Sequence, residues 1–102
     1  MAIKWGRPGW KFLHSVTFAY PEKPSLRTKI QYMKFFKSLQ YVLPCPTCRR
    51  EYSRAARKLN LGHLKNTETL SRWLVCVHNQ VNVKLGKVVV PFDEVKKMYM
   101  YT

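Results

Sequence analysis

The stretch SLRTKIQYMKFFKSLQYVLP, residues 25–44, determines the fold class. Apolar side chains recur in it at steps of three and four residues, with lysines between them: Leu26, Ile30, Met33, Phe36, Leu39 and Leu43. This spacing places the apolar side chains on one face of an α-helix. Ser25 is a typical N-cap residue, and Pro44 marks the end of the helix. We therefore predict an amphipathic helix over residues 26–43.

Prolines and glycines divide the rest of the chain into further helical blocks. The predicted helices run from Pro8 or Gly9 to Tyr20, from Cys45 or Pro46 to Gly62, from Asn66 or Thr67 to Leu85, and onward from Pro91. The stretch KVVV, residues 87–90, is expected to be extended. Because helices and strands do not alternate along the chain, a thioredoxin fold is disfavoured. We predict one all-α domain over residues 1–102, a four-helix bundle plus a short fifth helix.

Composition limits the classes of function. The 102 residues are 46% hydrophobic and carry 19 Lys and Arg against 5 Asp and Glu, a formal net charge of +14. Such a charge favours anionic partners, although it can also simply keep a small protein soluble. No apolar run is long enough to span a membrane, and the N-terminal stretch lacks the features of a secretory signal. The expected location is therefore the cytoplasm.

Two of the three cysteines lie in LPCPTCRREY, residues 43–52, at the start of a predicted helix. Backbone N–H groups and the helix dipole stabilise a thiolate at such a position. Arg49 and Arg50 add positive charge, so we expect lowered pKa values for both Cys45 and Cys48. A Cys-x-x-Cys pair in these surroundings is typical of thiol–disulfide exchange.

Two other interpretations of Cys45 and Cys48 stay open. A structural zinc site needs four ligands, and the further candidates are Cys76, His14, His63 and His78. Cys76 and His78 are two residues apart on a predicted helix and point to nearly opposite faces, so we expect no metal. An inert structural disulfide is the second interpretation, but closing so short a loop stabilises little.

The fourth predicted helix contains WLVCVHNQVNVKLGK, residues 73–87, with polar side chains on a face that should be buried. Such a face does not normally carry His78, Asn79 and Asn82 unless a polar group docks there. Apolar walls and phosphate-binding lysines are available from Trp73, Val77, Val81, Leu85, Lys84 and Lys87. The combination favours a nucleotide with a large planar ring, although His78 alone could be an ordinary core histidine.

Taken together, WGRPGWKFLH, AYP, LPCPTC and WLVCVHNQVNVKLGK resemble the flavin-linked sulfhydryl oxidases of the Erv/ALR family. The elements occur in the family's order and cover nearly the whole chain. The resemblance implies a helical bundle that binds FAD, usually as a homodimer. It also implies an enzyme that oxidises two protein thiols to a disulfide and passes the electrons through FAD to oxygen, giving hydrogen peroxide.

The resemblance also implies roles for individual residues. Cys45 corresponds to the interchange thiol that meets the substrate, and Cys48 to the thiol beside the isoalloxazine, with which it forms a charge-transfer complex. The positions expected to bind the cofactor are Gly6, Arg7, Trp10, His14, Trp73, His78, Asn79, Val81, Asn82, Lys84, Leu85, Lys87 and Tyr99.

The sequence departs from many relatives in two ways. Val75 and Phe92 stand where those relatives carry a structural disulfide, and Cys76 is expected to be a free, largely buried thiol. No second cysteine pair is present, as in the short viral members of the family. The resemblance therefore implies a protein dithiol or a separate thiol carrier as electron donor and, for a viral protein, the host cytoplasm or the virion as location.

Two rival functions remain at this point. A small basic nucleic-acid-binding protein would explain the net charge and the aromatic residues, but the basic residues are spread along every block rather than gathered into one stripe. A thiol–disulfide carrier without flavin would explain the cysteine pair alone. We expect neither a membrane nor a nucleic-acid partner.

Overall fold

The computed structural model describes residues 5–100 and forms five α-helices and one 3₁₀ helix in that range. They are α1 (Gly6–Phe18), α2 (Leu26–Val42), α3 (Pro46–Ala56), η1 (Leu61–Leu64), α4 (Thr67–Lys84) and α5 (Phe92–Met100). The predicted all-α class, with four main helices and a short fifth one, is confirmed. None of the described helices is both long and apolar enough to cross a membrane.

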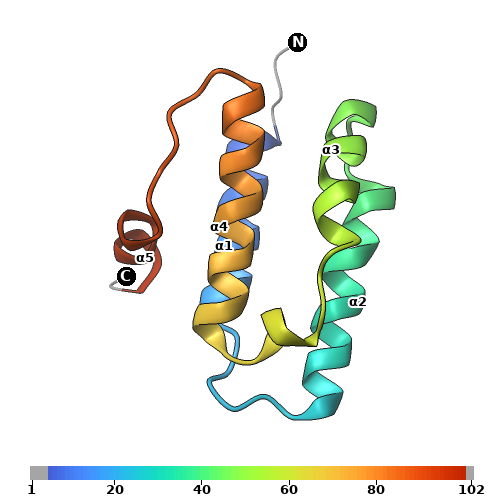
Figure 1. Cartoon of the computed structure of the whole chain (residues 1–102), viewed down its shortest axis with the longest axis vertical. Coiled ribbons are helices and arrows are strands. Elements are labelled where there is room, and N and C mark those ends of the chain that lie inside the picture. The colour runs from blue at the N-terminus through green and yellow to red at the C-terminus, as the bar shows by residue number, and fades with distance from the viewer. Residues whose placement is uncertain (1–4, 101–102) are drawn as a thin grey trace.

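The helices are arranged as two antiparallel pairs, α1 with α4 and α2 with α3 (Figure 1). η1 contacts both α2 and α4 and joins the pairs at one end of the molecule. α5 packs on α1 and α4, on the side away from α2 and α3 (Figure 1). The α1–α4 pair is therefore the centre of the fold, with different neighbours on its two sides.

The core lies between the two helix pairs. Phe36 on α2 and Leu70 and Leu74 on α4 are completely buried. Trp73 on α4 meets Phe36 edge to face at 5.6 Å between ring centroids, and it meets Tyr52 on α3 at 6.3 Å. Burial of such large apolar side chains drives the two pairs together.

The sequence around α2 folds as its pattern predicts. The Ser25 hydroxyl accepts a hydrogen bond of 3.1 Å from the backbone N–H of Thr28, so the predicted N-cap is confirmed. The helix ends at Val42, one residue before the expected end and two before Pro44. Its phenylalanine at position 36 is the innermost point of the predicted apolar face.

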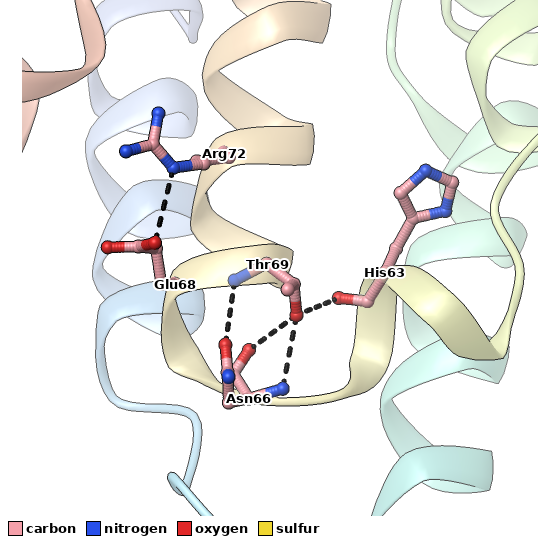
Figure 2. A network of polar contacts seen from close by, with 5 residues as sticks. All are labelled: His63, Asn66, Glu68, Thr69 and Arg72. Atoms are coloured by element: carbon pink, nitrogen blue, oxygen red, sulfur yellow. Dashed lines mark hydrogen bonds and ion pairs between the residues drawn. The ribbon is translucent and has the colours of Figure 1, made fainter.

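The start of α4 is fixed by a reciprocal cap (Figure 2). The side chain of Asn66 accepts from the Thr69 backbone N–H at 2.9 Å, and the Thr69 hydroxyl accepts from the Asn66 N–H at 3.1 Å. The same hydroxyl donates to the His63 carbonyl of η1 at 2.9 Å. Since these bonds satisfy groups that a helix end leaves open, they set where α4 begins.

Two predicted boundaries are wrong. α1 begins at Gly6, before Pro8, because a proline in the first turn removes no intrahelical hydrogen bond. The third helix ends at Ala56 rather than continuing to Gly62. Asn60 then caps the separate helix η1 through a 2.8 Å bond from the Gly62 N–H, and this side-chain bond restarts the helix in a new direction.

Candidate functional site

The cysteine pair lies at the N-terminus of α3. Cys45 is the N-cap residue, with extended backbone angles, and its sulfur accepts a 3.2 Å hydrogen bond from the backbone N–H of Cys48. Pro46 occupies the first turn. Both cysteines are free thiols. The pair therefore sits where the open N–H groups of the helix face a sulfur, as expected for a thiolate site.

The two thiols have opposite pKa shifts. The pKa of Cys45 is lowered, chiefly by hydrogen bonds from the side chain and backbone of Cys48, and also by the charge of Arg49. The pKa of Cys48 is raised to about 11 by burial, by its hydrogen bond to Cys45 and by the negative charge of Cys45. The expectation of two lowered values is thus right for Cys45 and wrong for Cys48, because one thiolate disfavours a second beside it.

Cys45 lies just beneath the surface. Its side chain is 6% exposed, but its neighbours Pro44 and Pro46 are both exposed. Hydrogen bonds rather than burial have the largest influence on the Cys45 pKa, as expected for a sulfur close to the molecular surface. Cys48, by contrast, is half-buried. The cysteine pair therefore lies close to the molecular surface, at the proline-flanked turn.

A pocket forms between α1, α4 and α5. It has a volume of about 110 Å³ and is lined by His14, Val75, His78, Asn79, Asn82, Val90, Val95, Met98 and Tyr99. Five of these residues were predicted to bind the cofactor, and α1, α4 and α5 bring them together. The pocket is smaller than the roughly 300 to 1,000 Å³ of typical ligand pockets, so in this arrangement it holds part of a dinucleotide at most.

Two histidines line this pocket, and a tryptophan stacks on one of them. The Nε2 of His14 and the Nδ1 of His78 are 2.9 Å apart, so one imidazole donates to the other. Trp10 stacks on His78 with ring centroids 3.9 Å apart and an interplanar angle of 5°. The Nδ1 of His14 is buried and has no hydrogen-bond partner among the described residues. A buried polar atom without a partner is costly, so this site favours a ligand with a polar group.

Both imidazoles are held in the neutral form. Burial, followed by the charge that His78 carries when protonated, lowers the pKa of His14 to about 4. Burial and the charge of Lys87 lower the pKa of His78 to about 4. At neutral pH the pair therefore offers uncharged donor and acceptor nitrogens.

Asn79 fastens the segment that closes the pocket. Its side-chain amide donates to the Val90 carbonyl at 2.8 Å, and its side-chain oxygen accepts from the Val90 N–H at 3.0 Å. Asn82 donates to the Asn79 side chain at 3.4 Å. The predicted direct role of Asn79 toward a cofactor therefore competes, in this structure, with a bond to the chain itself.

The other residues predicted to bind a cofactor are dispersed. Gly6 is the first residue of α1, Val81 is half-buried, and Arg7, Leu85 and Lys87 are exposed. Lys84 pairs with Glu51 of α3 at 3.8 Å. Tyr99, by contrast, lines the pocket and also stacks on Phe18 of α1, with centroids 5.5 Å apart.

The cysteine pair and the pocket lie on different sides of α4. Neither Cys45 nor Cys48 is among the described residues that line the pocket. Figure 1 shows α5 on one side of the α1–α4 pair and α3 on the other. Trp73 belongs to the side of α3, because it packs on Tyr52 rather than on the pocket. Among the described residues, no contact joins the sulfurs to His78, Asn79 or Asn82, and the expectation that Cys48 lies beside the isoalloxazine stays a prediction.

The prediction that Cys76 is buried is wrong. Cys76 is exposed, and the amide nitrogen of Gln80 lies 3.7 Å from its sulfur. The apolar neighbours Val75 and Val77 are both buried, whereas Cys76 points between them to the outer face of α4. The residue is free, as expected.

Sequence reasoning did not assign four of the lining residues to the site: Val75, Val90, Val95 and Met98. Val95 and Met98 were recognised as residues of the last helix, but only Tyr99 of that helix was assigned to the site. Their spacing, with Tyr99 four residues after Val95, indicates one helix face and could have grouped them. Nothing local identifies Val90, which reaches the pocket through its bonds to Asn79.

A family model described as the Erv1/Alr family matches residues 7–100. Among curated proteins, the chain is 39% identical over 93 residues to a probable FAD-linked sulfhydryl oxidase, R368, of Acanthamoeba polyphaga mimivirus. This match covers 89% of the chain and 65% of the relative. The chain is also 37% identical over 90 residues to the FAD-linked sulfhydryl oxidase ERV1 of Arabidopsis thaliana. That match covers 88% of the chain and 47% of the relative. The chain thus spans less than two thirds of these relatives.

A solved structure gives the same result for the fold. The chain superposes on the crystal structure of the FAD-binding domain of Erv1 from Saccharomyces cerevisiae with a TM-score of 0.88 and 30% sequence identity. The superposition covers 97% of the chain and 94% of that domain. The similarity extends over all of the helices rather than over one motif.

Proposed function

This chain belongs to the Erv1/Alr family, and from that premise we propose that it is an FAD-dependent sulfhydryl oxidase. The reaction joins two thiols in a disulfide and reduces oxygen to hydrogen peroxide. The observation that carries the proposal is the sulfur of Cys45 at the N-cap of α3, bonded at 3.2 Å to the N–H of Cys48. It gives one member of the pair thiolate character, which thiol–disulfide exchange requires.

The residues around the pocket fit the cofactor in chemistry. The unpartnered Nδ1 of His14 calls for a polar group, and the flat stack of Trp10 on His78 suits an aromatic ring. Lys87, close enough to lower the pKa of His78, supplies positive charge for a phosphate. We propose that these residues and Asn82 hold FAD. When bound, FAD accepts the electron pair of the reduced cysteines and transfers it to oxygen.

The chain's own chemistry begins with the oxidised Cys45–Cys48 disulfide. A substrate thiolate attacks the sulfur of Cys45, the bond between the two cysteines breaks, and Cys48 leaves as a thiolate. The second substrate thiol then attacks the sulfur of the first, the bond between that sulfur and Cys45 breaks, and Cys45 leaves as a thiolate. The substrate leaves as a disulfide, and the cysteine pair now holds the two electrons.

Formation of the mixed disulfide changes the acidity of Cys48. In the reduced pair, burial raises its pKa, and the hydrogen bond and charge of Cys45 raise it further. A disulfide at Cys45 carries no charge and removes the last two causes. The backbone N–H of Cys48 and the charge of Arg49, which lower the Cys48 pKa, are then opposed by burial alone. The pKa of Cys48 is therefore lower in the mixed disulfide than in the reduced pair.

The test is reconstitution of the purified protein with FAD. We expect bound flavin absorbance, oxygen consumption with dithiothreitol as donor, and hydrogen peroxide in amounts equal to the oxygen consumed. A protein that stays colourless after reconstitution would contradict the cofactor. A coloured protein that consumes no oxygen with dithiothreitol would contradict the oxidase.

We also propose that the protein acts as a homodimer. Supporting this, α1 and α2 expose large apolar side chains, with Phe12 60% and Leu26 64% exposed. Surfaces of this kind are often covered by a partner. Sedimentation of the wild type and of Phe12→Asp tests the proposal, since a wild-type monomer at all concentrations would contradict it.

A further inference from the structure

Positive charge is concentrated on the half of the molecule that carries the cysteine pair. Residues 25–58, which contain α2 and α3, hold nine basic residues and one acidic residue. The remaining 68 residues hold ten basic and four acidic residues. The excess of positive charge per residue is therefore more than twice as high around the cysteines as elsewhere.

The basic side chains of α3 form a stripe. Arg50, Arg54 and Arg57 follow at helical spacing and are exposed. The stripe starts five residues after Cys45. The acidic residue of this stretch, Glu51, does not neutralise it, because Glu51 pairs with Lys84 of α4.

Two arginines near the cysteines, Arg50 and Arg54, are exposed and can bind a ligand, whereas Arg49 and Arg57 bond to the protein itself. Arg49 is half-buried and donates to the Leu43 carbonyl at 2.5 Å, so it stabilises the turn before Cys45. Arg57 bonds to the Ser53 hydroxyl at 3.1 Å. Arg50 and Arg54 are the exposed arginines nearest to the cysteines.

The helix beside α3 extends the positive surface. The Ser53 hydroxyl donates to the Gln40 side chain at 2.9 Å and ties the middle of α3 to α2. Lys37 lies within one turn of Gln40, and Lys34 one turn further along α2 is exposed. A ligand on this face of α3 therefore meets positive charge from two helices.

We propose that this surface selects the substrate: the protein oxidises dithiols that lie beside acidic residues in a protein or peptide, and Arg50 and Arg54 pair with those residues. The inference rests on the proposed oxidase function and names its substrate class. Acidic neighbours raise the pKa of a substrate thiol in free solution. When these acidic residues pair with arginines, they no longer raise the pKa of the substrate thiol. The attacking thiolate therefore forms close to Cys45. The positive charge of this surface also increases the rate at which an acidic substrate meets the protein.

The test uses three peptides with one Cys-x-x-Cys core, flanked by Asp and Glu, by Asn and Gln, or by Lys. With the FAD-reconstituted protein at low salt, we expect kcat/KM for the acidic peptide to exceed that for the neutral one by about tenfold, within the range of electrostatic steering. The ratio should approach one at about 1 M salt, where the Debye length is about 3 Å.

Charge variants locate the effect. In the double variant Arg50→Glu with Arg54→Glu we expect the preference to disappear or reverse, and in Arg50→Lys with Arg54→Lys we expect it to remain. The matched control is Lys23→Glu with Lys65→Glu, which changes the net charge equally. Both control lysines are exposed: Lys23 belongs to the α1–α2 connection and Lys65 to the η1–α4 connection. These connections lie at the end of the molecule opposite the α2–α3 turn (Figure 1). An equal loss of preference in the control would overturn the assignment to α3.

A binding measurement separates this proposal from the oxidase function. A labelled acidic peptide with serines in place of its cysteines should bind the wild type more tightly than the Arg50→Gln, Arg54→Gln variant, by fluorescence anisotropy. Oxidation of dithiothreitol without any preference among the peptides would overturn the docking surface and leave the oxidase intact. Tighter binding of an oligonucleotide of the same charge, lost in the same variant, would also overturn it and assign the surface to nucleic acid.

Discussion

The α2–α3 pair and the group formed by α1, α4 and α5 build their chemistry in different ways. On α3, two cysteines three residues apart and the N–H groups between them make the reactive pair within a single helical turn. On the other side, His14 and His78 meet although 64 residues separate them. The first site needs only a helix that begins at the right residue. The second exists only when three helices have packed.

This difference predicts different vulnerabilities. The cysteine pair loses its chemistry when one atom is replaced, whereas the scaffold around it is unaffected. The pocket depends on contacts such as the Asn79–Val90 bonds and the stack of Trp10 on His78. Changes there should reduce stability and cofactor binding together.

The largest expected effect is on the cysteine side. Cys48→Ser should reduce oxygen consumption with dithiothreitol to the background rate, because no Cys45–Cys48 disulfide can form. The melting temperature of the protein without FAD should stay close to that of the wild type. Oxygen electrode measurements and thermal unfolding followed by circular dichroism check both statements.

The order of the two sulfurs can be tested in the same experiment. Cys48→Ser and Cys45→Ser are each incubated with a peptide whose thiol is activated as a mixed disulfide with thionitrobenzoate. We expect Cys45 to react faster at neutral pH, because backbone N–H groups and the charge of Arg49 still lower its pKa in Cys48→Ser, whereas burial still raises the pKa of Cys48 in Cys45→Ser. Faster reaction of Cys48 would reverse the assigned roles.

The next effect is on the pocket side. Asn79→Ala removes both hydrogen bonds to Val90 and leaves its backbone groups without these partners. Because Val90 is half-buried and water can replace part of these bonds, urea unfolding should show a loss of stability of about 1 kcal/mol. FAD should bind more weakly by calorimetry, because α5 is held less firmly. The control Gln80→Ala, exposed on the same helix, should change neither quantity.

A smaller effect is expected from pH. The folded-state pKa values of His14 and His78 are about 4, below the ordinary 6.5, so the unfolded chain binds more protons between these values. Stability should therefore decrease as the pH falls from about 6.5 to about 4. We expect about 1 to 3 kcal/mol in total, since solvent screens the half-buried His78.

Removing the two imidazoles isolates their share of the pH dependence. In the double variant His14→Gln with His78→Gln, urea unfolding at several pH values should show a shallower slope between pH 4 and 6.5 than the wild type. An unchanged slope would mean that carboxylates elsewhere cause the whole effect.

The smallest effect is expected at the third cysteine. Cys76 is exposed on the outer face of α4 and belongs to neither site. Cys76→Ala should change the free energy of unfolding by less than about 0.5 kcal/mol and leave oxygen consumption unaltered. A loss comparable to that of Cys48→Ser in a folded variant would assign Cys76 a redox role and break the comparison between the two regions.

Local sequence determined much of this protein. The apolar period of residues 26–43, the cap at Ser25 and a helix start at Cys45 or Pro46 all follow from neighbours within one or two turns. The structure has this cap and this helix start where the pattern predicts, and it adds that Cys45 is itself the N-cap. A hydrogen bond between residues three apart needs no tertiary information. For the same reason the lowered pKa of Cys45 could be expected from sequence.

Only the tertiary structure decided which helix faces are covered and which distant side chains meet. In the folded chain Cys76 is exposed and Trp73 packs toward α3. Asn79 is hydrogen-bonded to Val90, and Lys84 is paired with Glu51. Each of these depends on how α4 is rotated against three other helices. That rotation is set by the summed burial of many side chains, so no single stretch of sequence contains it.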